Sequence, residues 1–61
     1  MDAITLKNAF FEHVKSGAFE DAEEVAAILV EFLLFQRDLG QDVRDTLVGW
    51  QARRSLLQLM Q

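Results

Sequence analysis

The chain has 61 residues, which is enough for one domain at most. It contains no cysteine and a single histidine, which excludes a disulfide framework and a zinc centre built from thiolates or several imidazoles. Hydrophobic residues make up 51% of the chain and charged residues 26%, a balance that excludes a disordered tail and favours a folded protein.

No segment of the chain predicts export or insertion into a membrane. The basic stretch and apolar run of a signal peptide are missing after Asp2. The longest apolar run, Val25 to Phe35, contains Glu31 and is shorter than the roughly 20 residues that span a bilayer. We therefore expect a soluble cytoplasmic protein that does not bind membranes.

The net charge of −4 is unevenly distributed along the chain. Seven acidic residues and two lysines fall in residues 1–35, whereas three aspartates and four arginines fall in residues 36–61. The first part is therefore strongly acidic and the second slightly basic. A surface with this charge repels nucleic acid over most of its area and attracts basic partners.

Residues 3–16 are expected to form the first helix, with Asp2 as its N-cap. Apolar residues at helical spacing form one stripe, which comprises Ala3, Leu6, Phe10 and Val14 and is widened by Ile4 and Phe11. Taken alone, residues 4–7 also suit a short strand, so helix or strand stays open there. Gly17 is expected to end the helix in a left-handed conformation.

Residues 22–39 are expected to form the second helix. Asp21, with Glu24 three residues later, is typical of an N-cap in a variant capping box, and acids in the first turn complement the helix dipole. Apolar residues lie nearly all round this helix, which favours a central position. Gly40 is expected to end it.

Residues 42–60 are expected to form the third helix. One apolar stripe comprises Val43, Leu47, Trp50 and Leu57, and a second set points progressively away from it, comprising Val48, Ala52, Leu56, Leu59 and Met60. Gly49 lies between the two sets and costs roughly 1 kcal/mol relative to alanine inside a helix. We therefore expect a bend or a break at Gly49.

These elements predict a compact, all-α, three-helix bundle in a single domain over residues 1–61. Three short helices cannot surround one of their own, so part of the apolar surface should stay open, as it does at interfaces. The chain has no glycine-rich phosphate loop, no metal-ligand spacing and no nucleophile–base pair. We therefore expect a protein-binding function, with no enzymatic activity, metal or cofactor.

A cluster of carboxylates is the main candidate site. Four acids fall near the start of the second helix and three lie elsewhere in the acidic part: Glu20, Asp21, Glu23 and Glu24, then Asp2, Glu12 and Glu31. Capping and solvated surface are one interpretation of the four. The other is recognition of a partner's arginines or lysines, because carboxylates along a helix can take the places of phosphates in a basic groove.

Other polar and aromatic residues have simpler interpretations. Glu31 is either an exposed position or a partner for an arginine across an interface. His13 is expected at the surface. Trp50 is either a core residue, which its alignment with Val43 and Leu47 favours, or an interface hot spot. Arg53 and Arg54 are too few for nucleic-acid binding, so we expect them to pair with the acidic half, either inside the monomer or across a dimer.

Ile4-Thr5-Leu6-Lys7 alternates apolar and polar residues, residues 8–16 have a helical pattern, and Gly17-Ala18-Phe19 leads into Ala22-Glu23-Glu24-Val25. This order over residues 4–34 resembles the dimerisation half of ParD-type ribbon-helix-helix antitoxins. Residues 37–50 are loosely similar to the toxin-binding tail of that family. The resemblance implies a paired N-terminal strand, a dimer and neutralisation of a toxin.

The small size, the lack of cysteine, the acidity and the helical pattern of the whole chain resemble small phage-encoded inhibitors, particularly type I anti-CRISPR proteins. This resemblance implies an inhibitor in the host-cell cytoplasm whose acidic helix face mimics nucleic acid. It would block a basic groove on a nucleic-acid-binding complex without contacting nucleic acid itself. The oligomeric state, monomer or homodimer, stays open. A third interpretation is a subunit that docks through Val48, Leu56, Leu59 and Met60.

Overall fold

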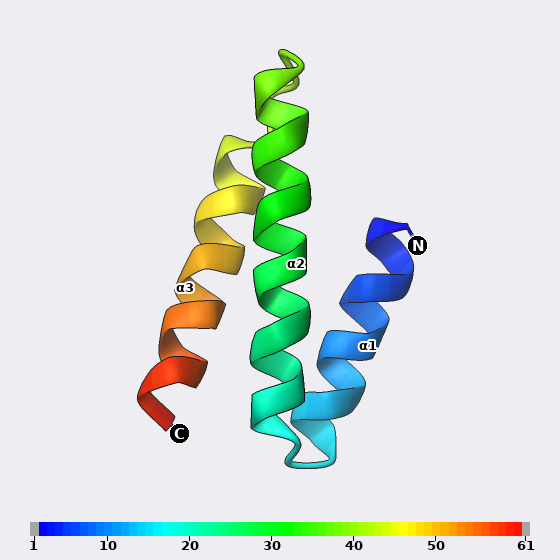
Figure 1. Cartoon of the computed structure of the whole chain (residues 1–61), viewed down its shortest axis with the longest axis vertical. Helices are drawn as coiled ribbons and strands as arrows, with labels where there is room; N and C mark the ends of the chain where they lie inside the picture. Colours follow the sequence, from blue (N-terminus) through cyan, green and yellow to red (C-terminus); the bar gives the residue numbers. More distant parts are fainter. Residues whose placement is uncertain (1, 61) are drawn as a thin grey trace.

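The chain folds into three α-helices joined by two short turns (Figure 1). The computed structural model describes residues 2–60, and its helices are α1 (Ala3–Lys15), α2 (Phe19–Asp38) and α3 (Arg44–Met60). The predicted all-α three-helix bundle is thus confirmed. Residues 4–7 form the first turns of α1, so the N-terminal strand that the ParD-type resemblance implies is not formed. None of the helices within residues 2–60 combines the length and apolar character needed to cross a membrane.

The second helix is central, as its apolar pattern predicted. Both α1 and α3 pack against α2, one on each side (Figure 1). The molecule measures 35 × 23 × 14 Å along its principal axes. Ile28, Glu31 and Phe35 are exposed, so α2 keeps one face open although it has a neighbour on each flank.

The core consists of ten apolar side chains from all three helices. They are Leu6 and Phe10 of α1, Ala22, Ala26, Leu29, Val30 and Leu33 of α2, and Leu47, Trp50 and Leu57 of α3. Ala22 and Ala26 are completely buried, and their small side chains let the neighbouring helices approach α2 closely. No polar or charged residue of the described chain is buried, so the core depends on apolar contacts alone.

Aromatic rings connect α1 to α3. The ring centroids of Phe10 and Trp50 are 4.8 Å apart, and their planes lie at 83° in an edge-to-face arrangement. Phe11 also approaches Trp50, with centroids 6.2 Å apart. Trp50 is 3% exposed, which confirms its predicted place in the core. Such aromatic pairs contribute about 0.5–1.5 kcal/mol beyond the burial of their area.

Gly17 and Gly40 end α1 and α2 as predicted. Their φ angles are +79° and +91°, a region that residues with a Cβ rarely enter. After α1, the Gly17 N–H donates to the Val14 carbonyl (3.1 Å) and the Ala18 N–H to the His13 carbonyl (2.8 Å). The same two bonds recur after α2, from Gly40 and Gln41. Both ends are therefore Schellman motifs, which satisfy carbonyls that the helix leaves unpaired.

Asp2 caps α1 as predicted. Its Oδ1 accepts a hydrogen bond of 2.8 Å from the backbone N–H of Thr5. This bond from Thr5 lowers the pKa of the Asp2 carboxyl below its ordinary value of 3.8, because it stabilises the charged form. The start of α1 is therefore fixed by one exposed side chain.

The start of α2 differs from the prediction. The helix begins at Phe19 rather than at residue 22, and its N-cap is Ala18, which makes no side-chain capping bond. The predicted cap at Asp21 is therefore wrong. Phe19 packs partly buried against the core, which explains the earlier start: the chain re-enters helix directly after Gly17. Glu20 and Asp21 lie in the first turn, and Glu23 and Glu24 follow in the second.

The third helix begins two residues later than predicted and runs without interruption. Arg44 is its first residue; the Leu47 N–H donates to the Val43 carbonyl over 2.8 Å. The predicted break at Gly49 is not found, because Arg44–Met60 is a single helix. Leu47 and Trp50, on either side of Gly49 in sequence, are both buried, so core packing holds the helix together through the glycine.

Candidate functional site

The seven candidate carboxylates lie on two helices and do not form one cluster. Asp2 and Glu12 belong to α1, where Asp2 is engaged as the cap. The other five belong to α2. Among these, Glu23 is half-buried, whereas Glu20, Asp21, Glu24 and Glu31 are exposed. The sequence cluster at residues 20–24 is therefore divided between the solvent-facing side of α2 and its flank.

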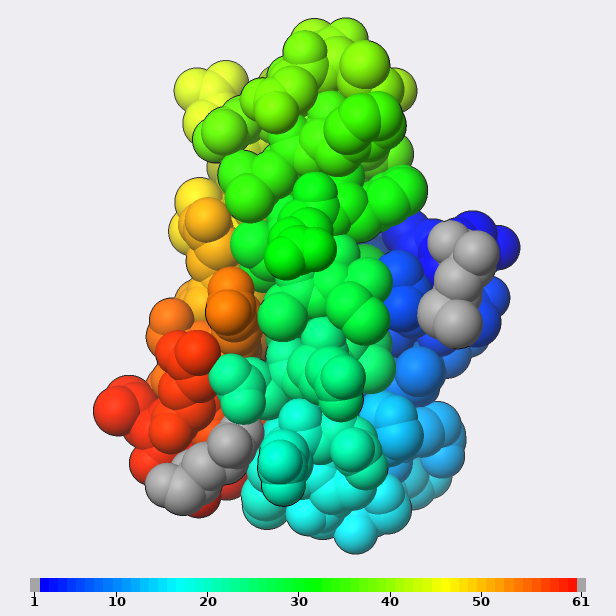
Figure 2. Space-filling model, in the orientation of Figure 1, coloured from blue at the N-terminus to red at the C-terminus, as the bar shows by residue number. Residues whose placement is uncertain are grey.

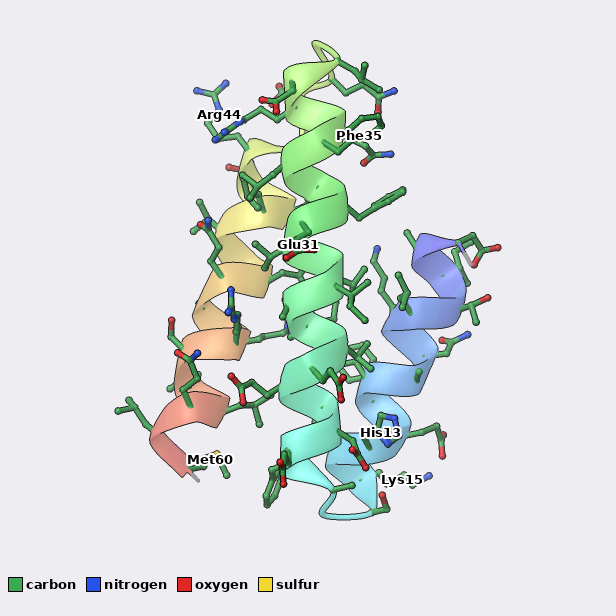
Figure 3. All side chains as sticks on the ribbon, in the orientation of Figure 1. His13, Lys15, Glu31, Phe35, Arg44 and Met60 are labelled. Carbon is green, nitrogen blue, oxygen red and sulfur yellow. The ribbon has the colours of Figure 1, made fainter. Side chains whose placement is uncertain are left out.

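The exposed acids of α2 form a row along its open side. Glu20, Glu24 and Glu31 are followed by Asp38, which is exposed as well, and the four lie within about 40° of one another around the helix axis at 100° per residue. Figure 3 shows Glu31 on the side of α2 turned to the viewer. We call these four residues the acidic row. The interpretation of Glu31 as an exposed position on α2 is confirmed.

Large apolar side chains accompany the acidic row. Ile28 is 46% exposed, Phe35 61% and Leu39 64%, and Ile28 and Phe35 lie within about 60° of Glu31 around the helix. Phe35 is near the upper, C-terminal end of α2, which extends beyond the N-terminal end of α1 (Figures 1 and 3). A helix of 20 residues is about 30 Å long and one of 13 residues about 20 Å, so the last turns of α2 have no neighbour on that flank.

The open side of α2 is less densely charged than nucleic acid. The acidic row places four carboxylates over about 27 Å. One DNA strand carries a phosphate about every 3.4 Å, or about eight over the same length. Charge alone therefore accounts for only part of what this surface offers a partner. Ile28 and Phe35, interleaved with the carboxylates, supply an apolar component.

A second exposed apolar stripe lies on α3. Val48, Leu56, Leu59 and Met60 are 59%, 61%, 83% and 60% exposed, so the residues of the third interpretation do lie on the surface. Figure 2 shows the last turns of α3 at the lower left of the molecule, beside the start of α2. Leu57, between these residues, is buried at 5%. Removing the chain after Ser55 would therefore delete a core side chain, and that test of docking would also disturb the fold.

Within residues 2–60, Arg53 makes no ion pair with the acidic half of the chain, so the predicted pairing inside the monomer is not found for this residue. Its guanidinium carbon lies 4.7 Å from the centroid of the Trp50 ring, a cation–π contact. Neither of the ion pairs found within residues 2–60 involves it. Arg54 is half-buried, and its Nε atom is buried without a hydrogen-bond partner. His13 is half-buried near the end of α1 (Figure 3).

A shallow open groove between α1 and α3 was not predicted from the sequence. It has a volume of about 440 Å³, and its walls are Lys7 and Phe11 of α1 and Asp45, Thr46, Gly49, Trp50 and Arg53 of α3. We call it the α1–α3 groove. Gly49 was the one signal for it, since an unexplained glycine inside a helix often has a packing or functional reason. The walls come from two helices far apart in sequence, which no local pattern reveals.

Two features of the described surface are candidates for contact with a partner or ligand. Within residues 2–60, no three His, Cys, Asp or Glu side chains lie close enough together to hold a metal ion. The surface offers two kinds of contact: carboxylates interleaved with apolar side chains on α2, and a groove with aromatic and cationic walls between α1 and α3. No protein-family model matches the chain, and neither a curated protein nor a solved structure shows significant similarity to it.

Proposed function

We propose that this chain is a non-catalytic inhibitor that binds a partner protein through the open side of α2. The partner is a nucleic-acid-binding complex with a basic groove, as the resemblance to type I anti-CRISPR proteins implies. The observation that carries this proposal is the acidic row with Ile28 and Phe35 interleaved, on the helix whose other side forms the core. The chain itself contacts neither nucleic acid nor a membrane in this function.

The acidic row and the apolar side chains of this surface contribute to binding in different ways. Exposed ion pairs contribute about 0.2–1 kcal/mol each. Full burial of a side chain such as Phe or Ile contributes about 1.5–3 kcal/mol. Phe35 and Ile28 therefore supply most of the affinity, and the acidic row selects a basic surface and speeds association. Phe35 is the residue we expect to act as the central anchor.

A basic groove that normally holds nucleic acid fits both components. Its arginines and lysines pair with carboxylates in place of phosphates, and the stems of these side chains offer apolar contact to Phe35 and Ile28. Because the acidic row has about half the charge density of a DNA strand, its binding should depend less on salt than DNA binding does. This difference distinguishes a mixed surface from pure charge mimicry.

Charge reversal at two sites tests the proposal. Glu24→Lys/Glu31→Lys changes the acidic row, and Glu12→Lys/Asp42→Lys is the matched control, because both variants raise the net charge from −4 to 0. All four side chains are exposed. Asp42 Oδ1 accepts a 3.5 Å hydrogen bond from the Arg44 N–H and lies 4.0 Å from its guanidinium, so circular dichroism is used to check that both variants keep their helicity. With a guide-loaded type I CRISPR surveillance complex as the probe, the first variant should lose competition with target DNA and the control should keep it. Equal loss in both variants would mean that only net charge matters.

A further inference from the structure

The acidic row and the α1–α3 groove lie on opposite sides of the molecule. In cross-section the helix axes form a triangle, because α1 and α3 each pack on α2 and Phe10 of α1 meets Trp50 of α3. The acidic row runs along the outer side of α2, at one corner of this triangle. The groove lies along the opposite edge, and its walls include no residue of α2.

The groove side carries positive charge. Lys7 stands on the α1 wall and Arg53 on the α3 wall, and Asp45 is the single carboxylate among the lining residues. Lys15 is exposed on the same side of α1, about 40° from Phe11 around the helix axis. These three cations and one carboxylate give a net charge of +2, whereas the whole chain has −4. The two sides of the molecule are therefore complementary in charge.

Exposed apolar side chains lie on both sides as well. On the groove side, Ile4 is 70% exposed and Phe11 52%, and the two lie within about 20° of each other around α1. Trp50 adds little to this surface, because it is 3% exposed and Arg53 lies over its ring. On the opposite side, apolar side chains stand between the carboxylates of the acidic row. Each side therefore combines charge of one sign with apolar contact.

The charges of the two sides are not satisfied within one copy of the chain. Three carboxylates of the acidic row and both groove cations take part in neither of the ion pairs found within residues 2–60: Glu20, Glu24, Glu31, Lys7 and Arg53. The outer side of a single helix is a convex ridge, and the shallow groove between two helices is its concave counterpart. A second copy of the chain thus offers each side the opposite charge and a matching shape.

We propose that copies of this chain associate head to tail, with the open side of α2 of one copy docked on the α1–α3 groove side of the next. The acidic row pairs with Lys7, Lys15 and Arg53, and the apolar side chains of α2 contact Ile4 and Phe11. Because the two surfaces differ, the contact is heterologous: each pair of copies leaves one side of each kind free for a further copy.

The association is weak and reversible. A helix of 20 residues is about 30 Å long and 10–12 Å wide, so the outer side of α2 covers roughly 300–360 Å² in projection. A standard interface takes about 800 Å² from each partner. Self-association covers the acidic row, so the single copy is the form able to bind another protein there. That consequence rests on the proposed function, whereas the head-to-tail contact does not.

Sedimentation of the unmodified protein alone is the first measurement. Its average mass should rise with concentration between about 10 µM and about 1 mM and exceed that of two chains, because the contact is open-ended. Raising the salt from about 0.05 M to about 0.5 M should reduce the association, because the charges of the two sides are then screened. A single chain at about 1 mM in low salt, or a mass that levels off at two chains, would overturn the proposal.

Two variants that each disable one side test the head-to-tail arrangement. Glu24→Lys/Glu31→Lys changes the acidic row, and its net charge is 0. Lys7→Glu/Arg53→Glu changes the groove side, and these side chains are exposed as well. Each variant alone should stay a single chain, whereas an equimolar mixture should form a complex with one copy of each, because each retains the side that the other lacks. A net charge of 0 in the first variant means that overall charge does not attract the two.

A matched control separates the groove side from overall charge. Arg37→Glu/Arg44→Glu and Lys7→Glu/Arg53→Glu both lower the net charge from −4 to −8, but Arg37 and Arg44 do not line the groove. The control should therefore associate more strongly than the groove variant. Circular dichroism checks that every variant is helical, and Lys7→Gln/Arg53→Gln replaces the groove variant if that one does not fold.

Three results would overturn the proposal. The first is that the mixture of the two variants forms no complex, and the second is that both variants still associate alone. The third is self-association that only Val48→Ser/Leu59→Ser removes, which would make the exposed stripe of α3 the contact between copies. The groove variant keeps the acidic row, so inhibition of DNA binding by that variant tests the proposed function separately from self-association.

Discussion

Phe10 of α1 meets Trp50 of α3 edge to face, with ring centroids 4.8 Å apart. Both side chains are almost completely buried, at 4% and 3% exposure. Elsewhere each outer helix packs on α2, so this aromatic pair is a main link between α1 and α3. At about 0.05–0.15 kcal/mol per residue, a chain of this length has a free energy of unfolding of only about 3–9 kcal/mol. One aromatic pair is therefore a considerable part of the total.

Phe10→Leu should lower the free energy of unfolding by about 1–2 kcal/mol, because it removes the ring contact and leaves a poorly filled site. Phe11→Leu, at the half-exposed neighbour, is the matched control and should cost about 0.5 kcal/mol or less. Urea unfolding followed by circular dichroism measures both. Equal losses for the two variants would show that the Phe10–Trp50 contact has no special weight.

Gly49→Ala should raise the free energy of unfolding by about 1 kcal/mol, because alanine is the better helix former and only the flexible end of Arg53 must move. Gly17→Ala should lower it by about 1–2 kcal/mol, although no atom lies within 4 Å of the added Cβ, because φ is +79° there. Thermal unfolding of the two variants checks this opposite pair of signs. A lower stability of Gly49→Ala would mean that the Arg53 side chain cannot move away from the added Cβ.

The contribution of the Asp2 cap should depend on pH. The hydrogen bond from the Thr5 backbone N–H lowers the pKa of Asp2, so its stabilising effect is present above the ordinary value of 3.8 and is lost as the pH falls through the lowered pKa. Asp2→Ala should therefore have a lower melting temperature than the unmodified protein at about pH 7, and the difference should shrink towards about pH 2. Asp2→Asn keeps an uncharged cap, so its advantage over Asp2→Ala should not change with pH. A difference between Asp and Ala that is constant with pH would contradict the role of the charged carboxylate.

Substitution of the buried Leu57 should lower the free energy of unfolding far more than substitution of its exposed neighbours. Leu57→Ala should cost about 2–5 kcal/mol, enough to unfold much of the protein, because Leu57 is 5% exposed. Leu56→Ser/Leu59→Ser should leave the free energy of unfolding within about 0.5 kcal/mol per residue, since both side chains are exposed. This double variant separates docking through α3 from folding, which truncation after Ser55 cannot do. A large loss of stability in it would show that the stripe belongs to the fold.

Local sequence patterns correctly predicted where α1 begins and where α1 and α2 end. Gly17 and Gly40 end their helices in the expected left-handed conformation, because few other residues adopt it. Asp2 caps α1 through the expected bond to Thr5. Apolar residues around nearly the whole of α2 correctly predicted a central helix, some of whose apolar side chains remain exposed. Each of these features depends on residues within one turn of each other or on the composition of one helix.

Features that depend on packing between helices were predicted less well from the sequence. The pattern of Asp21 and Glu24 is typical of a capping box, but burial of Phe19 draws the helix start forward and leaves both acids inside α2. Gly49 suggested a break, whereas α3 continues through it, with Leu47 and Trp50 buried on either side. The α1–α3 groove needs Phe11 and Trp50 side by side, a juxtaposition that only the tertiary fold creates.

The most direct measurement of the proposed function is inhibition of DNA binding by the unmodified protein. A guide-loaded type I CRISPR surveillance complex is incubated with increasing amounts of the protein, and target DNA binding is followed by electrophoretic mobility shift at several salt concentrations. The account predicts concentration-dependent loss of the DNA complex that Phe35→Ser weakens by tenfold or more, about 1.4 kcal/mol, without loss of helicity. Undiminished DNA binding at micromolar protein across a panel of type I complexes, or inhibition that Phe35→Ser and Glu24→Lys/Glu31→Lys both leave unchanged, would contradict it.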